Sequence, residues 1–411
     1  EPPRTWLKSF WLSPAGQDSP LYATYFRGIM LTRLLLTLLS PCIAIQNLHG
    51  QHQHGRNIQH VRARGKHSSK ARENHTFVNV TQDPFQSVSV IQPSALSQNL
   101  SVVQSAQGKP GENFSVVHVA YATTPDGFPG LLHSMISVAR NFQGERCHIH
   151  VIVAADHITK ASEVLACFER DVAALPKVTV ASLHVMPALP WDTSVMRTSA
   201  EGASRSWGHQ DKLSQPTVFA RFYLAEVLSD LPRVLWLDVD TIVCKDVAEL
   251  YQMKMTHAIA ARPVKRGAVV QKEFPRWSCT KDLDQTHTFT SFNTGVMVVD
   301  LNRFREGNWT PKLSKMAEAC VTNDQPTFNI VFMDNYQHFD KSWNTYALGS
   351  TVKARTKRIG NILHWSGPVK PWSEPEKCSN PEVRKNDMDC LSAENHADYD
   401  LYAPRETCPA V

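Results

Sequence analysis

The sequence contains 411 residues, of which 42% are hydrophobic, and its formal net charge at pH 7 is +5. This length and apolar content allow one large or two medium domains with a proper core, and they exclude a disordered or fibrous chain. Much of the modest basic excess lies in one early segment, so charge does not indicate nucleic acid as a partner.

The first candidate element is an apolar run near the beginning of the chain. Met30 is followed by LTRLLLTLLSPCIAIQNLHG, with a single arginine in a short apolar stretch. We interpret residues 30–50 as a secretory signal peptide or a short signal anchor, because the apolar run is short for a membrane span and is broken by Pro41. Residues 1–29 would be upstream read-through or a cytoplasmic tail. An anchor of this kind would be the protein's membrane contact.

Residues 51–112 form a basic segment rich in Ser, Gln and Asn that has little hydrophobic periodicity, and we expect a flexible stem here. The glycosylation sequence N-x-S/T begins at Asn74, Asn79, Asn99, Asn113 and Asn308. Four of these sites are clustered downstream of the signal-like run, which indicates a glycosylated stem. The predicted location is therefore the secretory pathway, in the lumen of the Golgi or the endoplasmic reticulum.

Nine cysteines are present, and Cys42 falls in the signal-like run. The remaining eight are an even number, which permits disulfides in an oxidising lumen, although spacing alone leaves their connectivity open. No pair has CxxC spacing, so the cysteines do not indicate a zinc or redox motif.

From residue 115 onward, predicted strands alternate with predicted helices. Strands are expected at 115–124 (SVVHVAYATT), 147–155 (CHIHVIVAA) and 177–185 (KVTVASLHV), and helices at 127–142 and 162–172. This alternation predicts an α/β fold with a mostly parallel sheet and helices on its faces.

The next predicted helix lies in SQPTVFARFYLAEVLSDL, residues 214–231, with a start near Ser214 and Pro216. Its apolar stripe contains Val218, Phe222, Ala225 and Leu228. Arg221 falls on another face, where it is either an exposed surface residue or a ligand-binding one. The strand RVLWL follows, fully apolar after its first residue, and Asp238 stands where it ends. Ligands bind beyond the carboxyl ends of such strands.

The stretch LWLDVDTIV carries two carboxylates one residue apart, and two chemistries use such a pair. A DxDxT phosphatase needs the motif on its first strand and an acidic pair downstream, but at least two strand-helix units precede Asp238 and no such pair follows. A nucleotide-sugar transferase needs a hard divalent cation, Mn²⁺ or Mg²⁺, to neutralise the pyrophosphate. It therefore also needs a phosphate-binding cation, and an imidazole ligand would favour Mn²⁺.

The segment ILHWSGPVKPW supplies both groups. His364 follows a short apolar strand, Gly367 allows the backbone to approach a phosphate, and Lys370 adds a compact positive charge. We expect Trp365 and Trp372 to pack this loop against the core.

Five blocks occur in the order ARFYLAEVL, VLWLDVDTIV, FNTGVMVVDLNRF, NDQPTFN and HWSGPVKPW. On these blocks the chain resembles a retaining glycosyltransferase of family 8, the group that includes glycogenin, bacterial galactosyltransferases and plant galacturonosyltransferase-like proteins. The resemblance extends from about His118 to Trp372. It implies a GT-A fold, a Rossmann-like α/β unit with a mostly parallel central sheet and helices on both faces, as a single catalytic domain over residues 113–372. An acidic, cysteine-containing tail, residues 373–411, would follow.

The resemblance also implies an activity, the transfer of a hexose or uronic acid from a UDP-sugar to a hydroxyl group of a glycan or glycoprotein, with retention at the anomeric carbon. Residue roles follow block by block. The metal ligands would be Asp238, Asp240 and His364. The nucleotide would contact Tyr121, Ala122, Thr123 and Val239, and the diphosphate would contact Gly367 and Lys370. The transferred sugar would contact Asn293, Gly295, Asp324 and Gln325, and Arg221 would reach the donor between phosphate and sugar. The family often has an acidic residue where this chain has Thr123.

Catalysis would involve Arg221, Asp324 and Gln325, and two routes to retention are open. A double displacement requires a carboxylate nucleophile, for which Asp324 and Gln325 are the nearest candidates. A front-face route, which we favour, needs no nucleophile. Each of these residues could instead have a purely structural role. Asn293 could bond the backbone groups at a strand end, and Asp324 and Gln325 could serve only as the N-terminus of a helix. The alternative function is a catalytically silent domain that binds a sugar nucleotide or glycan.

Overall fold

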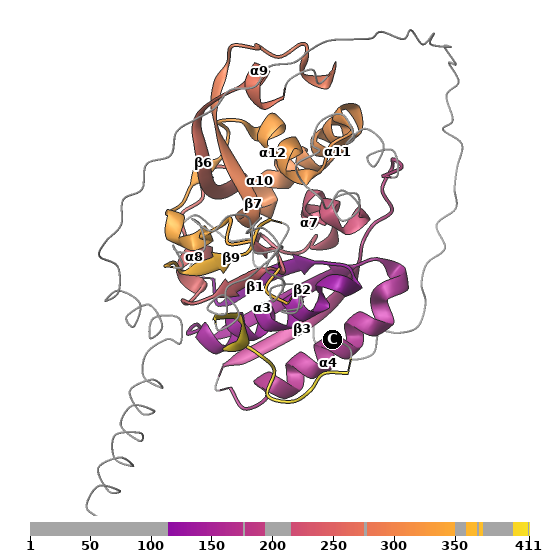
Figure 1. The fold of residues 1–411 in the computed structure, drawn as a ribbon, viewed down its shortest axis with the longest axis vertical. Coiled ribbons are helices and arrows are strands. Elements are labelled where there is room, and N and C mark those ends of the chain that lie inside the picture. Colours follow the sequence, from indigo (N-terminus) through magenta and orange to yellow (C-terminus); the bar gives the residue numbers. More distant parts are fainter. Residues whose placement is uncertain are drawn as a thin grey trace, which may run out of the picture. The chain divides into compact units, whose positions relative to one another are not determined.

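The computed structural model describes residues 114–175, 177–193, 215–274, 278–349, 359–367, 370–372, 398–409 and 411. The predicted signal, the stem with its sequons up to Asn113, and most of the tail lie outside these residues. Within the described part, a seven-stranded sheet has the order β3-β2-β1-β4-β7-β6-β8. Figure 1 labels β1, β2, β3, β6 and β7 of this sheet.

The first half of the sheet is parallel. It contains β1 (Val116–Ala122), β2 (Arg146–Val153), β3 (Val178–Val185) and β4 (Arg233–Leu237). The helices α3 (Phe128–Asn141) and α4 (Ile158–Val172) connect the first three of these strands. Every residue of β4 is buried, as expected for a parallel strand covered on both faces. The predicted alternation of strands and helices is confirmed here.

The second half of the sheet contains the one strand that runs against its neighbours. This strand is β7 (Thr288–Asp300), which pairs antiparallel with β4 and with β6 (Ile259–Val269), whereas β8 (Gln337–His338) pairs parallel with β6. The sheet is therefore mostly parallel, as predicted. A separate two-stranded sheet joins β5 (Thr241–Val243) to β9 (Ile362–His364) in antiparallel pairing.

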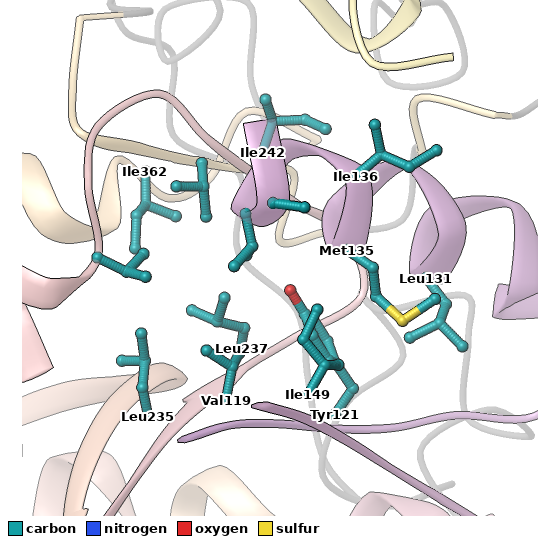
Figure 2. Packing of buried hydrophobic residues seen from close by; sticks show 14 of the residues in the cluster. Val119, Tyr121, Leu131, Met135, Ile136, Ile149, Leu235, Leu237, Ile242 and Ile362 are labelled. Atoms are coloured by element: carbon teal, nitrogen blue, oxygen red, sulfur yellow. The ribbon is translucent and has the colours of Figure 1, made fainter. Parts of the chain in front are cut away.

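Helices cover both faces of the large sheet, which confirms the predicted α/β layers. On one face, Leu131 and Met135 of α3 pack over Val119 of β1 and Ile149 of β2 in the larger core cluster (Figure 2). The opposite face packs against a second cluster. Its helices include α7 (Leu224–Val227), α10 (Leu301–Glu306), α11 (Trp309–Cys320) and α12 (Asp324–Phe332). The short helices α8 (Ala248–Tyr251) and α9 (Val270–Glu273) follow β5 and β6.

The helix predicted over residues 214–231 differs from the observed structure. A 3₁₀ helix, η3, spans Pro216–Phe222, and only the short helix α7 follows it; Ser214 lies outside the described residues. A 3₁₀ helix repeats every three residues, so Phe219 and Phe222 share one side, and both are fully buried. Arg221 is only 7% exposed, so its interpretation as an exposed surface residue is wrong.

The end of the chain is fastened to the α3–α4 side of the sheet. A disulfide joins Cys167 of α4 to Cys408, and the tail residues Tyr399 and Tyr402 are part of the larger core cluster. A second disulfide joins Cys279 to Cys320. Among the residues that the structure describes, no helix combines the length and apolar character required to cross a bilayer.

Candidate active site

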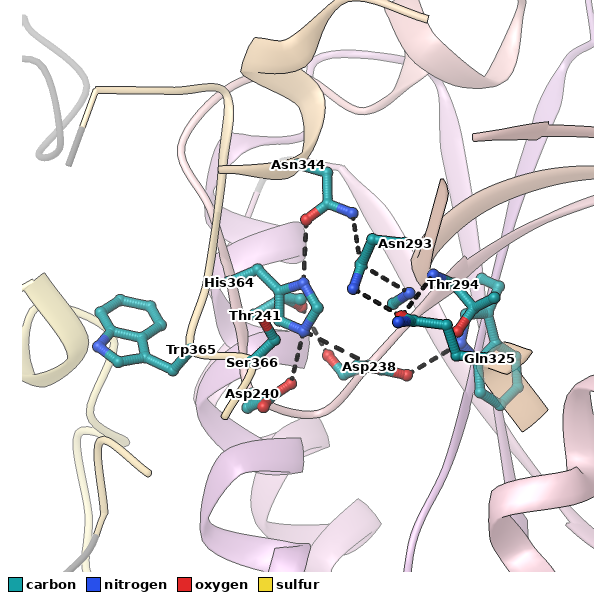
Figure 3. Close-up of polar contacts among 12 residues, drawn as sticks. Asp238, Asp240, Thr241, Asn293, Thr294, Gln325, Asn344, His364, Trp365 and Ser366 are labelled. Atoms are coloured by element: carbon teal, nitrogen blue, oxygen red, sulfur yellow. Dashed lines mark hydrogen bonds and ion pairs between the residues drawn. The ribbon is translucent and has the colours of Figure 1, made fainter. Parts of the chain in front are cut away.

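The predicted metal ligands converge at the end of β4. Asp238 and Asp240 lie in the turn between β4 and β5, and Thr241 of β5 is paired with His364 of β9. This pairing brings the histidine across from the carboxylates although more than a hundred residues separate them in the chain. His364 Nε2 lies 3.2 Å from Asp240 Oδ1 and 3.7 Å from Asp238 Oδ2 (Figure 3).

One oxygen of Asp238 is held by protein donors, while the other is directed at the cluster. Arg221 Nη2 donates to Asp238 Oδ1 at 2.9 Å, and Trp236 Nε1 donates to the same oxygen at 3.1 Å. The Arg221 guanidinium also lies 4.8 Å from the Trp236 ring centroid. Asp238 Oδ2 is therefore presented toward His364 in a fixed orientation.

Asp240 shows the same division between its two oxygens. Lys370 Nζ donates to Asp240 Oδ2, whereas Asp240 Oδ1 faces His364. Burial by itself would raise the pKa of Asp240, but Lys370 and His364 together lower it well below its usual range. The carboxylate is thus ionised at any physiological pH. Gly367, in the loop before Lys370, has a φ of 122°, a region that favours glycine.

His364 is oriented by an asparagine that the sequence analysis did not identify. Its Nδ1 lies 2.9 Å from Asn344 Oδ1, and both side chains are almost fully buried. Among the described residues, its Nε2 has no hydrogen-bond partner, although this atom is buried. An Nδ1–H bond to an amide oxygen leaves Nε2 as a lone-pair donor aimed at the two carboxylates. Two carboxylate oxygens and one imidazole nitrogen fit a divalent cation of the Mn²⁺ type.

Gly295 on β7 forms the floor of this cluster. A Cβ atom placed there would lie 2.1 Å from His364 Cε1 and 2.6 Å from Asp238 Oδ2. The backbone is also involved, because Asp238 N donates to Gly295 O at 2.8 Å. A larger residue at this position would therefore displace both candidate ligands.

Next to the metal candidates, Arg221 links the partly exposed carboxylate of Asp238 to the buried carboxylate of Asp324. Its Nη1 lies 2.8 Å from Asp324 Oδ2 and also donates to the Thr294 carbonyl oxygen at 3.0 Å. Thr294 Oγ1 donates to Asp324 Oδ2 at 3.1 Å. Burial raises the pKa of Asp324, and Arg221 opposes this effect. Asp324 is the first residue of α12, but its carboxylate is engaged in this network.

Asn293 and Gln325 continue the network toward β6. Asn293 Nδ2 donates to Gln325 Oε1 at 2.9 Å. Asn293 Oδ1 accepts from Asn344 Nδ2 at 2.8 Å and from Gly295 N at 3.0 Å. Asn293 lies well inside β7 and not at a strand end, and it bonds the side chains of Gln325 and Asn344 as well as the backbone N of Gly295. The structure therefore joins the predicted sugar-side residues and His364 through a single chain of hydrogen bonds.

The predicted nucleotide-side residues lie at the end of β1, beside β4. Thr123 follows β1 and is 6% exposed, and Val239 separates the two aspartates. Both approach Gly127, since a Cβ there would lie 2.1 Å from Thr123 Oγ1 and 3.4 Å from Val239 Cγ2. The parallel β1–β4 register, extended by two residues, brings Ala122 level with Asp238.

Tyr121 is the predicted residue that does not reach the site with its side chain. The ring is fully buried among Met135, Ile149 and Val119, and its hydroxyl lies 3.1 Å from Ser134 Oγ (Figure 2). Strand alternation directs Tyr121 to the α3 side. Only its backbone can contact a ligand.

Two expectations about the loop that carries His364 are met. Trp365 is fully buried in the larger core cluster, and Trp372 packs against the same cluster, with its Nε1 3.2 Å from the Asp126 carbonyl oxygen. Sequence reasoning missed Asn344, Thr294 and Trp236. Thr294 and Trp236 stand inside the quoted blocks, next to predicted residues, whereas Asn344 follows no motif that marks it.

A family model described as glycosyl transferase family 8 matches residues 118–376. The probable galacturonosyltransferase-like 4 of Arabidopsis thaliana is 30% identical over 252 residues, which cover 57% of this chain and 67% of that protein. The glycosyltransferase 8 domain-containing protein 1 of Danio rerio is 29% identical over 200 residues, which cover 40% of this chain and 54% of that protein. Among solved structures, the galactosyltransferase LgtC in complex with donor and acceptor sugar analogues is similar, with a TM-score of 0.46 and 15% identity over 69% of this chain and all of that chain.

Proposed function

Because the chain belongs to glycosyl transferase family 8, we propose that it moves a hexose or uronic acid from a UDP-sugar to a hydroxyl group of a glycan or glycoprotein, with retention at the anomeric carbon. The observation that carries this proposal is the convergence of Asp238, Asp240 and His364 with Lys370 at the carboxyl end of β4. A divalent cation and a lysine together can stabilise the charge that develops on a departing pyrophosphate.

Asp238, Asp240 and His364 would hold the divalent cation, for which we propose Mn²⁺, with Mg²⁺ as the alternative. When bound, this ion neutralises charge on the UDP pyrophosphate. The buried Nε2 of His364 supports the assignment, because its lone pair faces acceptor oxygens of Asp240 and Asp238 at 3.2 and 3.7 Å, and a buried acceptor without a hydrogen-bond donor costs free energy unless a cation lies between them. Lys370 donates to the Asp240 carboxylate, and its positive charge stabilises the departing diphosphate.

The network around Arg221 supports a front-face route over a double displacement. Asp324 is bonded to Arg221 and to Thr294, and Gln325 accepts from Asn293. Residues bound in this way serve to position the donor sugar. In the front-face step, the acceptor oxygen bonds to the anomeric carbon as the bond to the UDP oxygen breaks, and the acceptor proton passes to the leaving phosphate.

We place the enzyme in the lumen of the secretory pathway, Golgi or endoplasmic reticulum. Two disulfides among the described residues, Cys167–Cys408 and Cys279–Cys320, suit an oxidising compartment. Residues 113–372 are proposed as the catalytic domain, with the connection 193–213 and the tail after Trp372 as determinants of the acceptor, since loops on a fixed scaffold carry specificity.

The test is turnover of a panel of UDP-sugars with and without Mn²⁺, comparing the wild type with Asp240→Asn. We expect one donor to be used, and we expect the substitution to lower turnover by at least about a hundredfold, because the metal site loses a charged ligand. The matched control is Asp230→Asn, which changes an exposed aspartate near the start of β4 and should retain wild-type activity.

Two outcomes would count against this function. Metal-independent turnover that survives Asp240→Asn would remove the metal assignment. UDP binding by calorimetry without turnover of any donor would instead favour the catalytically silent binding domain.

A further inference from the structure

Four histidines lie side by side on β1, β2 and β3, away from the candidate active site. His118 of β1 is paired with His148 of β2, His150 is paired with Ala120, and His184 lies on β3. Even-numbered residues of β1 face away from α3, because Val117, Val119 and Tyr121 occupy the α3 side. The histidines therefore share the opposite face of the sheet.

Their ring nitrogens are close together. His118 Nδ1 lies 3.0 Å from His150 Nε2, and the rings of His148 and His150 are stacked with centroids 4.2 Å apart. His118, His148 and His150 each offer one ligand nitrogen, and these three nitrogens lie within 4.8 Å of one another. Two nitrogens bound to one zinc ion at about 2.0–2.1 Å lie roughly 3.3 Å apart in a tetrahedral arrangement. The observed pair needs to separate by only a few tenths of an ångström.

We propose that His118, His148 and His150 form a second metal site, specific for a late first-row divalent cation such as Zn²⁺, with His184 as a positioning residue. An all-nitrogen site selects Zn²⁺, Cu²⁺ or Ni²⁺, whereas the oxygen-rich cluster at the end of β4 selects Mn²⁺ or Mg²⁺. The two sites therefore bind different ions.

The outer partners match those of a metal-binding histidine. His150 Nδ1 lies 3.0 Å from His184 Nε2, and His148 Nε2 lies 2.7 Å from Ser182 Oγ. Ligating histidines use their second nitrogen to bond such a partner, which fixes the ring orientation.

The site is separate from the proposed chemistry. His150 is level with Ala120, three residues before Thr123, which at about 3.3 Å per residue places it roughly 10 Å below the strand end. An ion held by His118 of β1 and by His148 and His150 of β2 would cross-link these two parallel strands, so we expect it to stabilise the sheet without taking part in transfer.

The experiment uses the full chain, stripped with a chelator and reloaded with Zn²⁺ or Co²⁺ in the presence of excess Mn²⁺. Bound zinc is counted after gel filtration, and Co²⁺ reports tetrahedral nitrogen ligation by its visible absorption. The test variants are His118→Gln and His148→Gln, both at partly exposed positions. The controls are His338→Gln, at an exposed histidine of β8, and Asp240→Asn.

We expect the wild type and both controls to hold one more zinc ion per chain than the two test variants, and to show the Co²⁺ bands that these variants lose. The histidines of residues 51–112 remain in every variant, so their zinc cancels in the comparison. A cooperative unfolding transition in the absence of metal shows that a variant is folded. If His118→Gln does not fold, the comparison of His148→Gln with the controls is sufficient to test the proposal. Equal zinc in folded His148→Gln and in His338→Gln would overturn the proposal. Loss of zinc in Asp240→Asn would assign the ion to the other cluster and overturn it as well.

Discussion

At the scale of single residues, the candidate site depends on side chains that each perform two tasks. Asp238 and Asp240 each offer one oxygen to a protein cation and direct the other at His364. Arg221 bridges Asp238 and Asp324, so the metal side and the sugar side are mechanically linked. A substitution on the metal side should therefore alter the positions of the side chains on the sugar side, and the reverse.

The orientation of His364 leads to the first prediction, for Asn344→Ala. Without the Asn344 amide, the His364 ring loses the acceptor that fixes its Nδ1 proton, and Asn293 loses a donor. Loss of such an outer partner typically lowers metal affinity about 10–100-fold. Mn²⁺ titration by calorimetry measures this change.

The control for this substitution is Asn361→Ala. Asn361 lies next to β9 and donates to Ser342 Oγ at 3.1 Å, outside the metal network. It should retain wild-type Mn²⁺ affinity. Equal affinity in Asn344→Ala and Asn361→Ala would show that His364 needs no orienting partner.

At the scale of elements, the pairing of β5 with β9 assembles the site, and the loop after β9 delivers Lys370. That loop turns at Gly367, where φ is 122°. A side chain at this φ costs on the order of 1–3 kcal/mol, so the loop would shift. We predict that Gly367→Ala weakens UDP binding about tenfold, because a strain of about 1.4 kcal/mol changes an equilibrium tenfold. Calorimetric titration with UDP and Mn²⁺ checks this.

Gly267 provides a matched control, since its φ of 65° is also positive and a Cβ there meets nothing within 4 Å. Gly267→Ala imposes a comparable backbone cost in β6, outside the loop that carries Lys370. UDP affinity should remain unchanged in this variant. An equal loss in both glycine variants would mean that strain anywhere in the domain, and not the position of Lys370, controls binding.

At the scale of the whole molecule, the end of the chain is part of the folded core. Besides the Cys167–Cys408 disulfide, Tyr399 stacks on His133 of α3 with ring centroids 3.8 Å apart. His133 Nδ1 donates to the Pro129 carbonyl oxygen at 2.8 Å. Burial lowers the pKa of His133 from 6.5 to about 4, although the Pro129 bond opposes this.

This pKa shift predicts acid sensitivity. The unfolded histidine takes up a proton below pH 6.5 while the folded one resists until about pH 4, so stability falls as the pH falls through this window. Between pH 7 and pH 5 the loss from His133 amounts to about 2 kcal/mol of unfolding free energy. Urea unfolding of wild type and His133→Phe at both pH values should show that the variant loses less stability by this amount.

His257→Phe serves as the control, because His257 lies partly exposed before β6. It should retain the pH dependence of the wild type. If His133→Phe also retains it, other buried groups cause the acid sensitivity.

The sequence alone determined the fold class, because strand and helix periods alternate over residues 115–185 and a fully apolar strand precedes Asp238. It also determined the family and the main metal candidates, since blocks of unusual composition identify them without knowledge of distances. The 3₁₀ helix at Pro216–Phe222 escaped prediction because its residues suit either helix type, and in the observed helix Arg221 lies between the carboxylates of Asp238 and Asp324.

Only the tertiary structure decided how these residues work together. Asn344 is an ordinary polar residue in sequence, and it became part of the site because the β5–β9 pairing set His364 beside it. The side chain of Tyr121 points away from the site, because the alternation of side chains along β1 places it on the α3 face. The histidines of β1, β2 and β3 are far apart in the chain, and parallel register alone brings them together. Contacts between distant segments depend on register and packing, which a single sequence does not record.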